Sequence, residues 1–247
     1  MENIFMRDEK KYLITTDKAA VLQMQLARHM TIDRLSEYLV QNIYFDTDSW
    51  DIIRESIEKP LYKEKLRLRF YDQFNSLSKG YLELKKKYEG IVYKRRMAFP
   101  LNHLKTRGVR EIVSNDDSQI SREISFFLQN NPVYEKIYLA YKRIAYNGVE
   151  EKDFRVTFDR DVIFSIIKPD INAGKLLNFN FHSECSRQPL NHNQIIMEIK
   201  AAGAIPMWFT RTLSELKIFP VSISKAGTCY ALHAMNYYNP QEEKNAA

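Results

Sequence analysis

The sequence contains neither of the glycine-rich patterns that cradle phosphates in many nucleotide-binding proteins. Its 247 residues include only 7 glycines, and no GxxxxGKS/T or GxGxxG pattern occurs among them. If a chain without such a loop binds a nucleotide, it must hold the phosphates with side chains.

Other common sites and segments are missing as well. Cys185 and Cys229, the two cysteines, have no metal-ligand spacing and no partners for a disulfide framework. The five histidines are scattered, and none forms a pair at helical metal spacing. No stretch approaches the roughly 18 apolar residues of a transmembrane segment, and the N-terminus has no secretory signal. These absences favour a reduced, cytoplasmic protein.

The charge balance is modestly basic. Lys and Arg number 37 against 31 for Asp and Glu, which gives a net charge of +6. This excess favours an anionic partner without choosing among nucleic acid, phosphates and a membrane surface. No repeat, low-complexity block or linker interrupts the chain. We therefore expect one domain over 1–247, with 238–247 as a frayed tail.

Several segments alternate charged and hydrophobic residues, as strands do. The clearest is KLRLRF at 65–70, followed by YLELKKK at 81–87 and IMEIK at 196–200. Successive side chains of a strand point to opposite faces, so the charges of each segment share one face. A sheet with these faces turned inward would form a basic, water-filled cavity that suits a polyanion. The predicted inward residues are Arg67, Arg69, Glu83, Lys85, Arg143, Arg155 and Glu198.

Patterning along the chain predicts an α+β fold. Strands are expected over 10–15, 40–45, 65–71, 81–88, 91–99, 134–146, 155–166 and 194–201. Helices are expected over 17–30, with Asp17 as the cap, and over 101–108, 118–130 and 205–218. Hairpins dominate the connections, which indicates an antiparallel β-barrel tunnel of about eight strands with flanking helices.

The charged faces suggest a chemistry. Arg67 and Arg69 could each grip phosphate oxygens with a bidentate guanidinium, although an exposed basic edge strand explains the pair equally well. Glu83 lies two residues from Lys85, and Glu198 two residues from Lys200. A carboxylate among cations invites Mg²⁺ or Mn²⁺, although a cross-strand ion pair is the simpler interpretation. Three further residues share a face of one predicted strand, namely Arg155, Thr157 and Asp159.

An ordered series of short segments resembles a known family. The segments are EKKYL at 9–13, NIYFDT at 42–47, KLRLRFY at 65–71, ELKKK at 83–87, VYKRR at 92–96, YKR at 141–143, RVTFD at 155–159, MEIK at 197–200 and SK at 224–225. Together they resemble the VTC domain, the catalytic module of polyphosphate polymerases, within the triphosphate tunnel metalloenzyme superfamily. The related CYTH branch opens with ExExK, whereas this first strand offers only Glu9 and Lys11.

The resemblance implies a tunnel enzyme that uses Mn²⁺ or Mg²⁺. It would transfer the terminal phosphoryl group of a nucleoside triphosphate, expected to be ATP, to a growing polyphosphate chain. Glu198 would hold the metal, with Glu83 as a second carboxylate, and Arg67, Arg69 and Lys85 would also serve catalysis. The implied phosphate ligands are Lys11, Arg67, Arg69, Lys85, Lys94, Tyr141, Arg143, Arg155 and Lys225.

Three alternatives remain open at this point. A metal-dependent triphosphate or polyphosphate hydrolase would use the same tunnel and could orient water with Glu83. A non-enzymatic polyphosphate-binding module would keep the cations but gain nothing from Glu198. A nucleic-acid binder is permitted by the charge and the aromatic residues, but nothing resembles a recognition helix, so no nucleic acid is expected as a partner.

Overall fold

The structure is a computed structural model, and it describes residues 8–58, 60–71, 78–89, 91–105, 107–167 and 187–238. The chain divides into two compact units, and each is considered by itself. Unit 1 comprises Met1–Val40, Ala140–Val162 and Leu190–Ile223. Unit 2 comprises Gln41–Leu139, Ile163–Pro189 and Ser224–Ala247.

The strands of the described residues form an antiparallel sheet, as predicted. They are β1 (Asp8–Thr15), β2 (Met30–Ile32), β3 (Tyr38–Asp46), β4 (Tyr62–Tyr71), β5 (Lys79–Tyr88), β6 (Ile91–Pro100), β7 (Tyr134–Gly148), β8 (Arg155–Ile166) and β9 (Gln194–Ala201). In unit 1 the order is β1-β9-β8-β7, with β2 beside β7, and in unit 2 it is β7-β3-β4-β5-β6. Over the described ranges, the hydrogen-bonded neighbours on this path run from β1 to β6.

Helices accompany the strands in both units. Unit 1 contains α1 (Thr16–Leu26) and α6 (Met207–Glu215). Unit 2 contains α2 (Asp51–Glu58), the 3₁₀ helix η1 (Leu101–Lys105), α3 (Val109–Ser114), α4 (Gln119–Asn130) and α7 (Lys225–Tyr238). In the described part of the chain, no helix is both long and apolar enough to cross a membrane.

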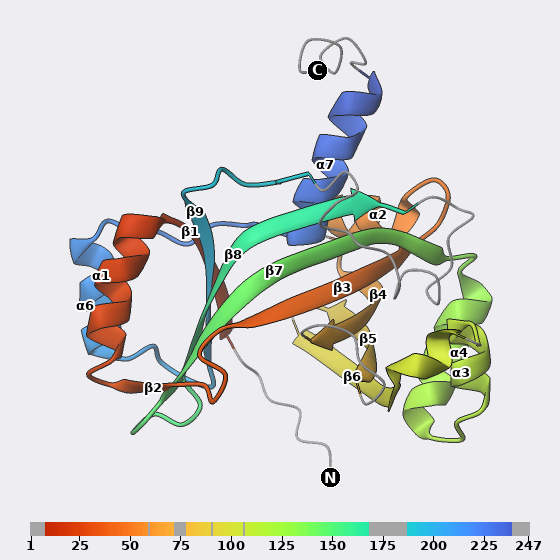
Figure 1. Cartoon of the computed structure of the whole chain (residues 1–247), viewed down its shortest axis with the longest axis horizontal. Helices are drawn as coiled ribbons and strands as arrows, with labels where there is room; N and C mark the ends of the chain where they lie inside the picture. The colour runs from red at the N-terminus through yellow and green to blue at the C-terminus, as the bar shows by residue number, and fades with distance from the viewer. Residues whose placement is uncertain are drawn as a thin grey trace. The chain divides into compact units, whose positions relative to one another are not determined.

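In unit 1, one face of the sheet is apolar and covered by helices. Leu22 of α1 and Phe209 of α6 are fully buried against strand residues such as Val156 and Met197. Figure 1 shows both helices on the same side of β1 and β9. Because side chains alternate along a strand, the opposite parity of β1, β8 and β9 is left for polar residues.

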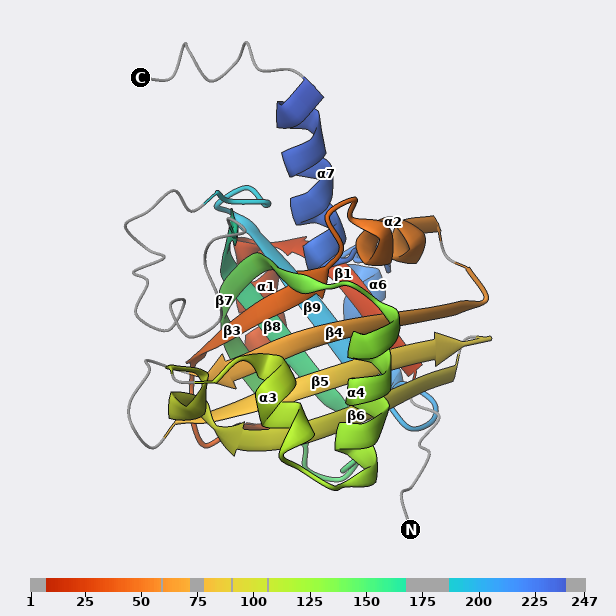
Figure 2. The ribbon, with the colours of Figure 1, turned by 90° about the vertical axis from the view of Figure 1, so that its right-hand side faces the viewer.

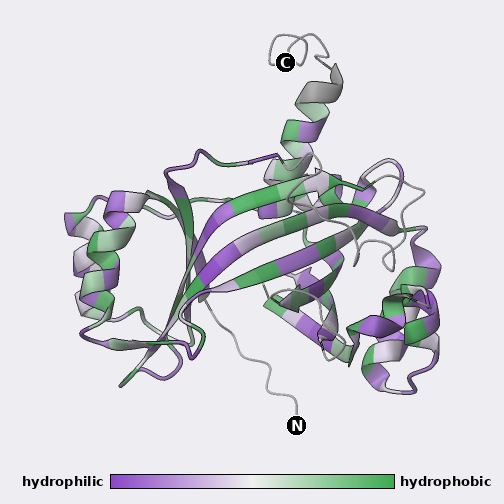
Figure 3. Cartoon of the chain, in the orientation of Figure 1, coloured by the Kyte–Doolittle hydropathy of each residue, from purple (hydrophilic) through white to green (hydrophobic). Residues whose placement is uncertain are grey.

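In unit 2, the same alternation separates an apolar face from a charged one. Leu66 and Leu68 of β4 lie opposite Leu84 and Leu82 of β5, and all four are fully buried. The helices α3 and α4 lie on this side of β5 and β6 (Figure 2) and bury residues such as Phe127. Figure 3 shows hydrophilic and hydrophobic residues alternating along the strands.

The predicted strands over 155–166 and 194–201 are confirmed at both ends, and the other predicted strands are confirmed with ends one to three residues longer. Three helix predictions were wrong in detail. In the segment 101–108 the 3₁₀ helix η1 ends at Lys105, and Gly108 holds the N-cap position of α3 with an extended backbone. The helix predicted over 17–30 ends at Leu26; its N-cap position is Thr15, whose side chain makes no capping hydrogen bond, and Asp17 lies in its first turn. The helix predicted over 205–218 is shorter, Met207–Glu215. Cys185 and the tail over 239–247 lie outside the described residues.

Candidate functional site

The charged face of unit 2 is built from three adjacent strands. The ladders place Lys65, Lys85 and Lys94 in one row across β4, β5 and β6. The next row contains Arg67, Glu83 and Arg96. Arg69 follows on β4, two residues further along the same face. We call these seven residues the basic face, since it carries six cations and one carboxylate.

Glu83 is the centre of the basic face. Its side chain is 1% exposed, and cations bind both of its oxygens. Arg67 donates to Oε2 from Nε at 2.7 Å and from Nη2 at 2.6 Å. Lys94 Nζ lies 2.8 Å from Oε1, and Arg96 donates to the same oxygen from Nε at 2.7 Å. The carboxylate therefore organises three cations that the sequence places on two different strands.

These contacts shift the titration of the cluster. Burial would raise the pKa of Glu83, but the charges of Arg67, Arg69 and Lys94 hold it far below its usual value. Burial lowers the pKa of Lys94 to about 8, with a smaller lowering from Arg96 and Arg67 and an opposing effect of Glu83. Glu83 is thus an anion throughout the neutral range, whereas Lys94 loses its proton more readily than an ordinary lysine.

Both carboxylate oxygens of Glu83 are already used by cations. A divalent cation would have to displace them and would meet the field of several positive charges. The arrangement therefore argues against the predicted role of Glu83 as a second metal ligand. It argues equally against Glu83 as a residue that orients water for hydrolysis.

The row of lysines on the basic face favours an anionic ligand. Lys85 lies directly opposite both Lys65 and Lys94, and its side chain is exposed. Like charges directly opposite each other on neighbouring strands are destabilising, and a bound anion would relieve that repulsion. Lys86 is on the other face of β5, where it pairs with Glu64 at 3.2 Å.

Arg69 is held in place by a buried amide. Its side chain is nearly buried, and its Nε donates to Oδ1 of Asn42 at 2.9 Å. Asn42 in turn donates from Nδ2 to the carbonyl oxygen of Leu139 at 3.2 Å. Arg67 also donates to the hydroxyl of Tyr44 at 3.2 Å. Burial would raise the pKa of Tyr44, but Arg67 and Arg69 lower it overall.

Unit 1 has a second charged face, which mixes both signs. Across β1, β9 and β8, one row contains Glu9, Lys200 and Arg155, and the next contains Lys11, Glu198 and Thr157. Asp159 lies two residues further along β8, and Arg143 of β7 pairs with it. We call this the mixed face. It comprises Glu9, Lys11, Arg143, Arg155, Thr157, Asp159, Glu198 and Lys200.

Arg143 and Asp159 form a bidentate ion pair on the mixed face. Arg143 donates from Nε to Oδ1 at 2.6 Å and from Nη2 to Oδ2 at 2.8 Å. Asp159 is fully buried, and the guanidinium of Arg143 lies over the ring of Tyr141. Burial would lower the pKa of Arg143, but Asp159, Tyr141 and Glu198 raise it well above its ordinary value. The pair keeps this guanidinium charged and in a defined orientation.

Glu198 is the carboxylate of the mixed face that best fits a metal. It is nearly buried, and Lys200 Nζ lies 2.9 Å from its Oε1. Among the described residues, no group of three acidic, histidine or cysteine side chains could hold a metal ion. Mg²⁺ and similar hard cations are commonly held by one or two carboxylates together with substrate phosphates, and Glu198 suits that mode.

The remaining predicted ligands are divided between the two units. Lys11 of β1 donates to the carbonyl oxygen of Ile223 at 3.4 Å and lies 3.5 Å from Glu9. Arg155 lies 3.4 Å from Asp33. Lys225 is the first residue of α7 in unit 2. Lys142 of β7 is exposed and pairs with Asp161.

Sequence reasoning missed several residues of these faces. Arg96, Lys65 and Asp159 were not predicted as ligands, although each shares strand parity with a residue that was. The register of the β5–β6 hairpin could have revealed Arg96. If Tyr88 and Ile91 lie opposite each other at the turn, counting back along both strands places Arg96 opposite Glu83.

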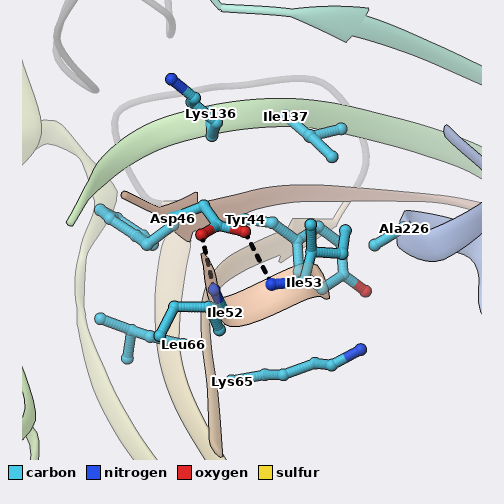
Figure 4. A pocket seen from close by; sticks show the side chains of 10 residues that line it. Tyr44, Asp46, Ile52, Ile53, Lys65, Leu66, Lys136, Ile137 and Ala226 are labelled. Atoms are coloured by element: carbon cyan, nitrogen blue, oxygen red, sulfur yellow. Dashed lines mark hydrogen bonds between the residues drawn. The ribbon is translucent and has the colours of Figure 1, made fainter. Parts of the chain in front are cut away.

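Unit 2 also contains a small pocket beside α2. Figure 4 shows Asp46 in its wall, where Oδ1 accepts from the Ile52 amide and Oδ2 from the Ile53 amide. Asp46 therefore caps α2. None of the predicted phosphate ligands lines this pocket, so we do not place the site there.

Comparison with known families identifies the chain. The model of the VTC domain matches residues 6–234, which is nearly the whole sequence. The chain belongs to the VTC domain family. No curated protein matches the sequence significantly.

Solved structures with a similar arrangement come from distant proteins. Two are each described as a "putative adenylate cyclase". The one from Bacillus halodurans is 14% identical, with 88% of this chain and 95% of that chain covered and a TM-score of 0.44. The one from Vibrio parahaemolyticus is 10% identical, with 91% and 97% covered and a TM-score of 0.44. The PH1819 protein of Pyrococcus horikoshii is 12% identical, with 85% and 86% covered and a TM-score of 0.39. Similarity at this level does not define an activity.

Proposed function

We propose that this VTC domain is a polyphosphate polymerase that takes phosphoryl groups from a nucleoside triphosphate, with ATP as the expected donor. The observation that carries the proposal is the basic face, which gathers six cations on three adjacent strands, three of them paired with the buried carboxylate of Glu83. Such a density of cations is suited to a ligand with several adjacent phosphates. Membership of the VTC domain family supports the same conclusion.

In the proposed reaction, a terminal oxygen of the polyphosphate chain attacks the γ-phosphorus of ATP. The bond from that phosphorus to the β–γ bridging oxygen breaks, and ADP leaves with the electron pair. The attacking oxygen is already an anion, so no protein base is required. This agrees with a site made of cations and carboxylates, in which Arg67, Arg69 and Lys85 bind phosphate oxygens and neutralise charge that develops during transfer.

Several of the remaining proposed groups belong to the mixed face. Arg143, oriented by Asp159, and Lys11 and Arg155 are further cations for phosphate oxygens. Glu198 would hold Mn²⁺ or Mg²⁺, which when bound neutralises phosphate charge and polarises the group that is transferred. Lys94, Tyr141 and Lys225 complete the proposed phosphate ligands. Glu83 is assigned to the organisation of Arg67, Lys94 and Arg96 and not to the metal.

The deciding experiment incubates the purified protein with ATP and either Mn²⁺ or Mg²⁺ and analyses all products. Long phosphate chains, with one ADP released for each phosphoryl group that enters them, would support the polymerase. Free phosphate without chains would show a hydrolase instead. Binding of inorganic triphosphate without any turnover would identify a binding module and overturn the proposed enzyme.

A further inference from the structure

The mixed face of unit 1 contains two buried polar atoms that have no hydrogen-bond partner among the described residues. They are Oγ1 of Thr157 and Nε of Arg155, which lie two residues apart on one face of β8. Thr157 is only 5% exposed. A buried hydrogen-bond donor without an acceptor is rare in proteins and costs stability. Two such donors side by side fit an acceptor that a ligand supplies.

The surroundings of Thr157 are charged. It lies directly opposite Glu198 of β9, which in turn lies opposite Lys11 of β1. Arg155 lies opposite Lys200. The tip of the Arg155 side chain is engaged, because its Nη2 donates to Asp33 at 3.4 Å, whereas its Nε is one of the two unpartnered atoms. Thr157 therefore shares its face with the cations Lys11, Arg155 and Lys200 and lies opposite the carboxylate expected to hold the metal.

The two unpartnered atoms together indicate the sign of the ligand. A threonine hydroxyl can donate to an anion or accept from a donor, and it can also coordinate a cation. The Nε of an arginine can only donate. A single ligand group that satisfies both atoms must therefore be an acceptor. A non-bridging phosphate oxygen meets this requirement, and a metal ion does not.

We propose that Thr157 is a ligand-binding residue whose hydroxyl donates to a phosphate oxygen that Arg155 Nε also contacts. This inference rests on the proposed function, because it takes the triphosphate as the ligand. It adds a second neutral hydroxyl, after that of Tyr141, to a set of otherwise charged ligands. Such a group recognises an oxygen at a defined position, whereas long lysine side chains only require negative charge nearby.

The test measures binding of inorganic triphosphate by calorimetry, first without a metal and then with Mn²⁺. Thr157→Val keeps the shape of the side chain and removes the hydroxyl. We expect its affinity without metal to fall roughly tenfold, which is about 1.4 kcal/mol. Its thermal midpoint without ligand should be equal to that of the wild type or higher, because the substitution removes an unsatisfied buried group. Thr157→Ser should keep most of the affinity.

Thr212→Val is the matched control. The Thr212 hydroxyl donates to the carbonyl oxygen of Trp208 at 3.0 Å within α6, so its loss should lower the thermal midpoint and leave triphosphate affinity unchanged. If Thr157→Val does not fold, Thr157→Ala removes the same hydroxyl and should show the same loss of affinity.

The outcomes separate this inference from the proposed function. If the wild type binds triphosphate and Thr157→Val binds it equally well, Thr157 is not a phosphate ligand. A loss of affinity that appears only with Mn²⁺ would assign the hydroxyl to the metal and overturn its assignment to phosphate. If the wild type itself does not bind triphosphate, the proposed function fails, and this inference fails with it.

Discussion

Arg67 and Glu83 lie opposite each other on β4 and β5, and two nitrogens of the guanidinium reach a single carboxylate oxygen. The other oxygen is occupied by Lys94 and Arg96. Glu83 thereby acts as an internal anion that holds the cations together before any phosphate arrives. An external anion and Glu83 then compete for the same positive charges, which makes the consequences of removing Glu83 testable.

Glu83→Gln should destabilise the free protein and make it respond more strongly to triphosphate. Removing one partner of a buried ion pair costs on the order of 3 kcal/mol, somewhat less here because the cations are partly exposed. The remaining cations should bind an external anion more tightly, so inorganic triphosphate should raise the thermal midpoint of the variant more than that of the wild type. Differential scanning calorimetry with and without triphosphate measures both effects.

Glu123→Gln is the control for this prediction. Glu123 of α4 also pairs with cations of the same strands, Lys86 at 3.9 Å and Arg95 at 3.2 Å, but on the opposite face. Its loss should cost less than about 1 kcal/mol and leave the response to triphosphate unchanged. An equal response to triphosphate in Glu83→Gln and the wild type would contradict the assignment of Glu83 as an internal anion.

Arg67→Ala and Arg69→Ala should each weaken triphosphate binding by about 1.5–3 kcal/mol, the usual contribution of a hydrogen bond to a charged group. Several cations of the basic face should contribute to binding, so neither variant should abolish it. Isothermal titration calorimetry provides the affinities. Arg95→Ala removes a cation of β6 that points to the other face and pairs with Glu123, so its affinity should match the wild type. Unchanged affinity in both Arg67→Ala and Arg69→Ala would argue against the basic face as the binding surface.

The charge of Lys94 should make binding dependent on pH in a mildly alkaline range. Burial lowers its pKa to about 8, so the free protein carries this charge below that pH and loses it as the pH rises through it. Triphosphate affinity should therefore fall several-fold more between pH 7 and pH 9 in the wild type than in Lys94→Arg, since an arginine stays protonated there. The comparison at each pH cancels the titration of the ligand itself. Parallel pH profiles for the two proteins would show that Lys94 does not titrate in this range.

Much of this arrangement follows from local pattern, because alternation decides which side chains share a face. Arg67 and Arg69 share one strand face, as the sequence predicts, and α4 lies within the predicted helix over 118–130. The short helix α2 was missed although Asp51 stands in its first turn, since its side-chain cap is Asp46 at the end of the preceding strand. The unsatisfied hydroxyl of Thr157 could not be predicted either, because it depends on what the packed neighbours fail to provide.

Glu198→Gln should abolish metal-dependent turnover and leave the fold and most triphosphate binding intact. The substitution keeps the shape of the side chain but removes the charge that would hold a divalent cation. Electrostatic binding of triphosphate should persist or tighten because one repelling anion is gone.

Glu9→Gln is the matched control. Glu9 is on the same face, one row away and opposite Lys200, so the substitution removes an equal charge and leaves the proposed metal ligand in place. Turnover at saturating ATP over a series of Mn²⁺ concentrations, together with triphosphate titrations without metal, separates the two effects. Glu9→Gln should remain active with an unchanged metal requirement. Near wild-type, metal-dependent turnover in Glu198→Gln would refute Glu198 as the metal ligand.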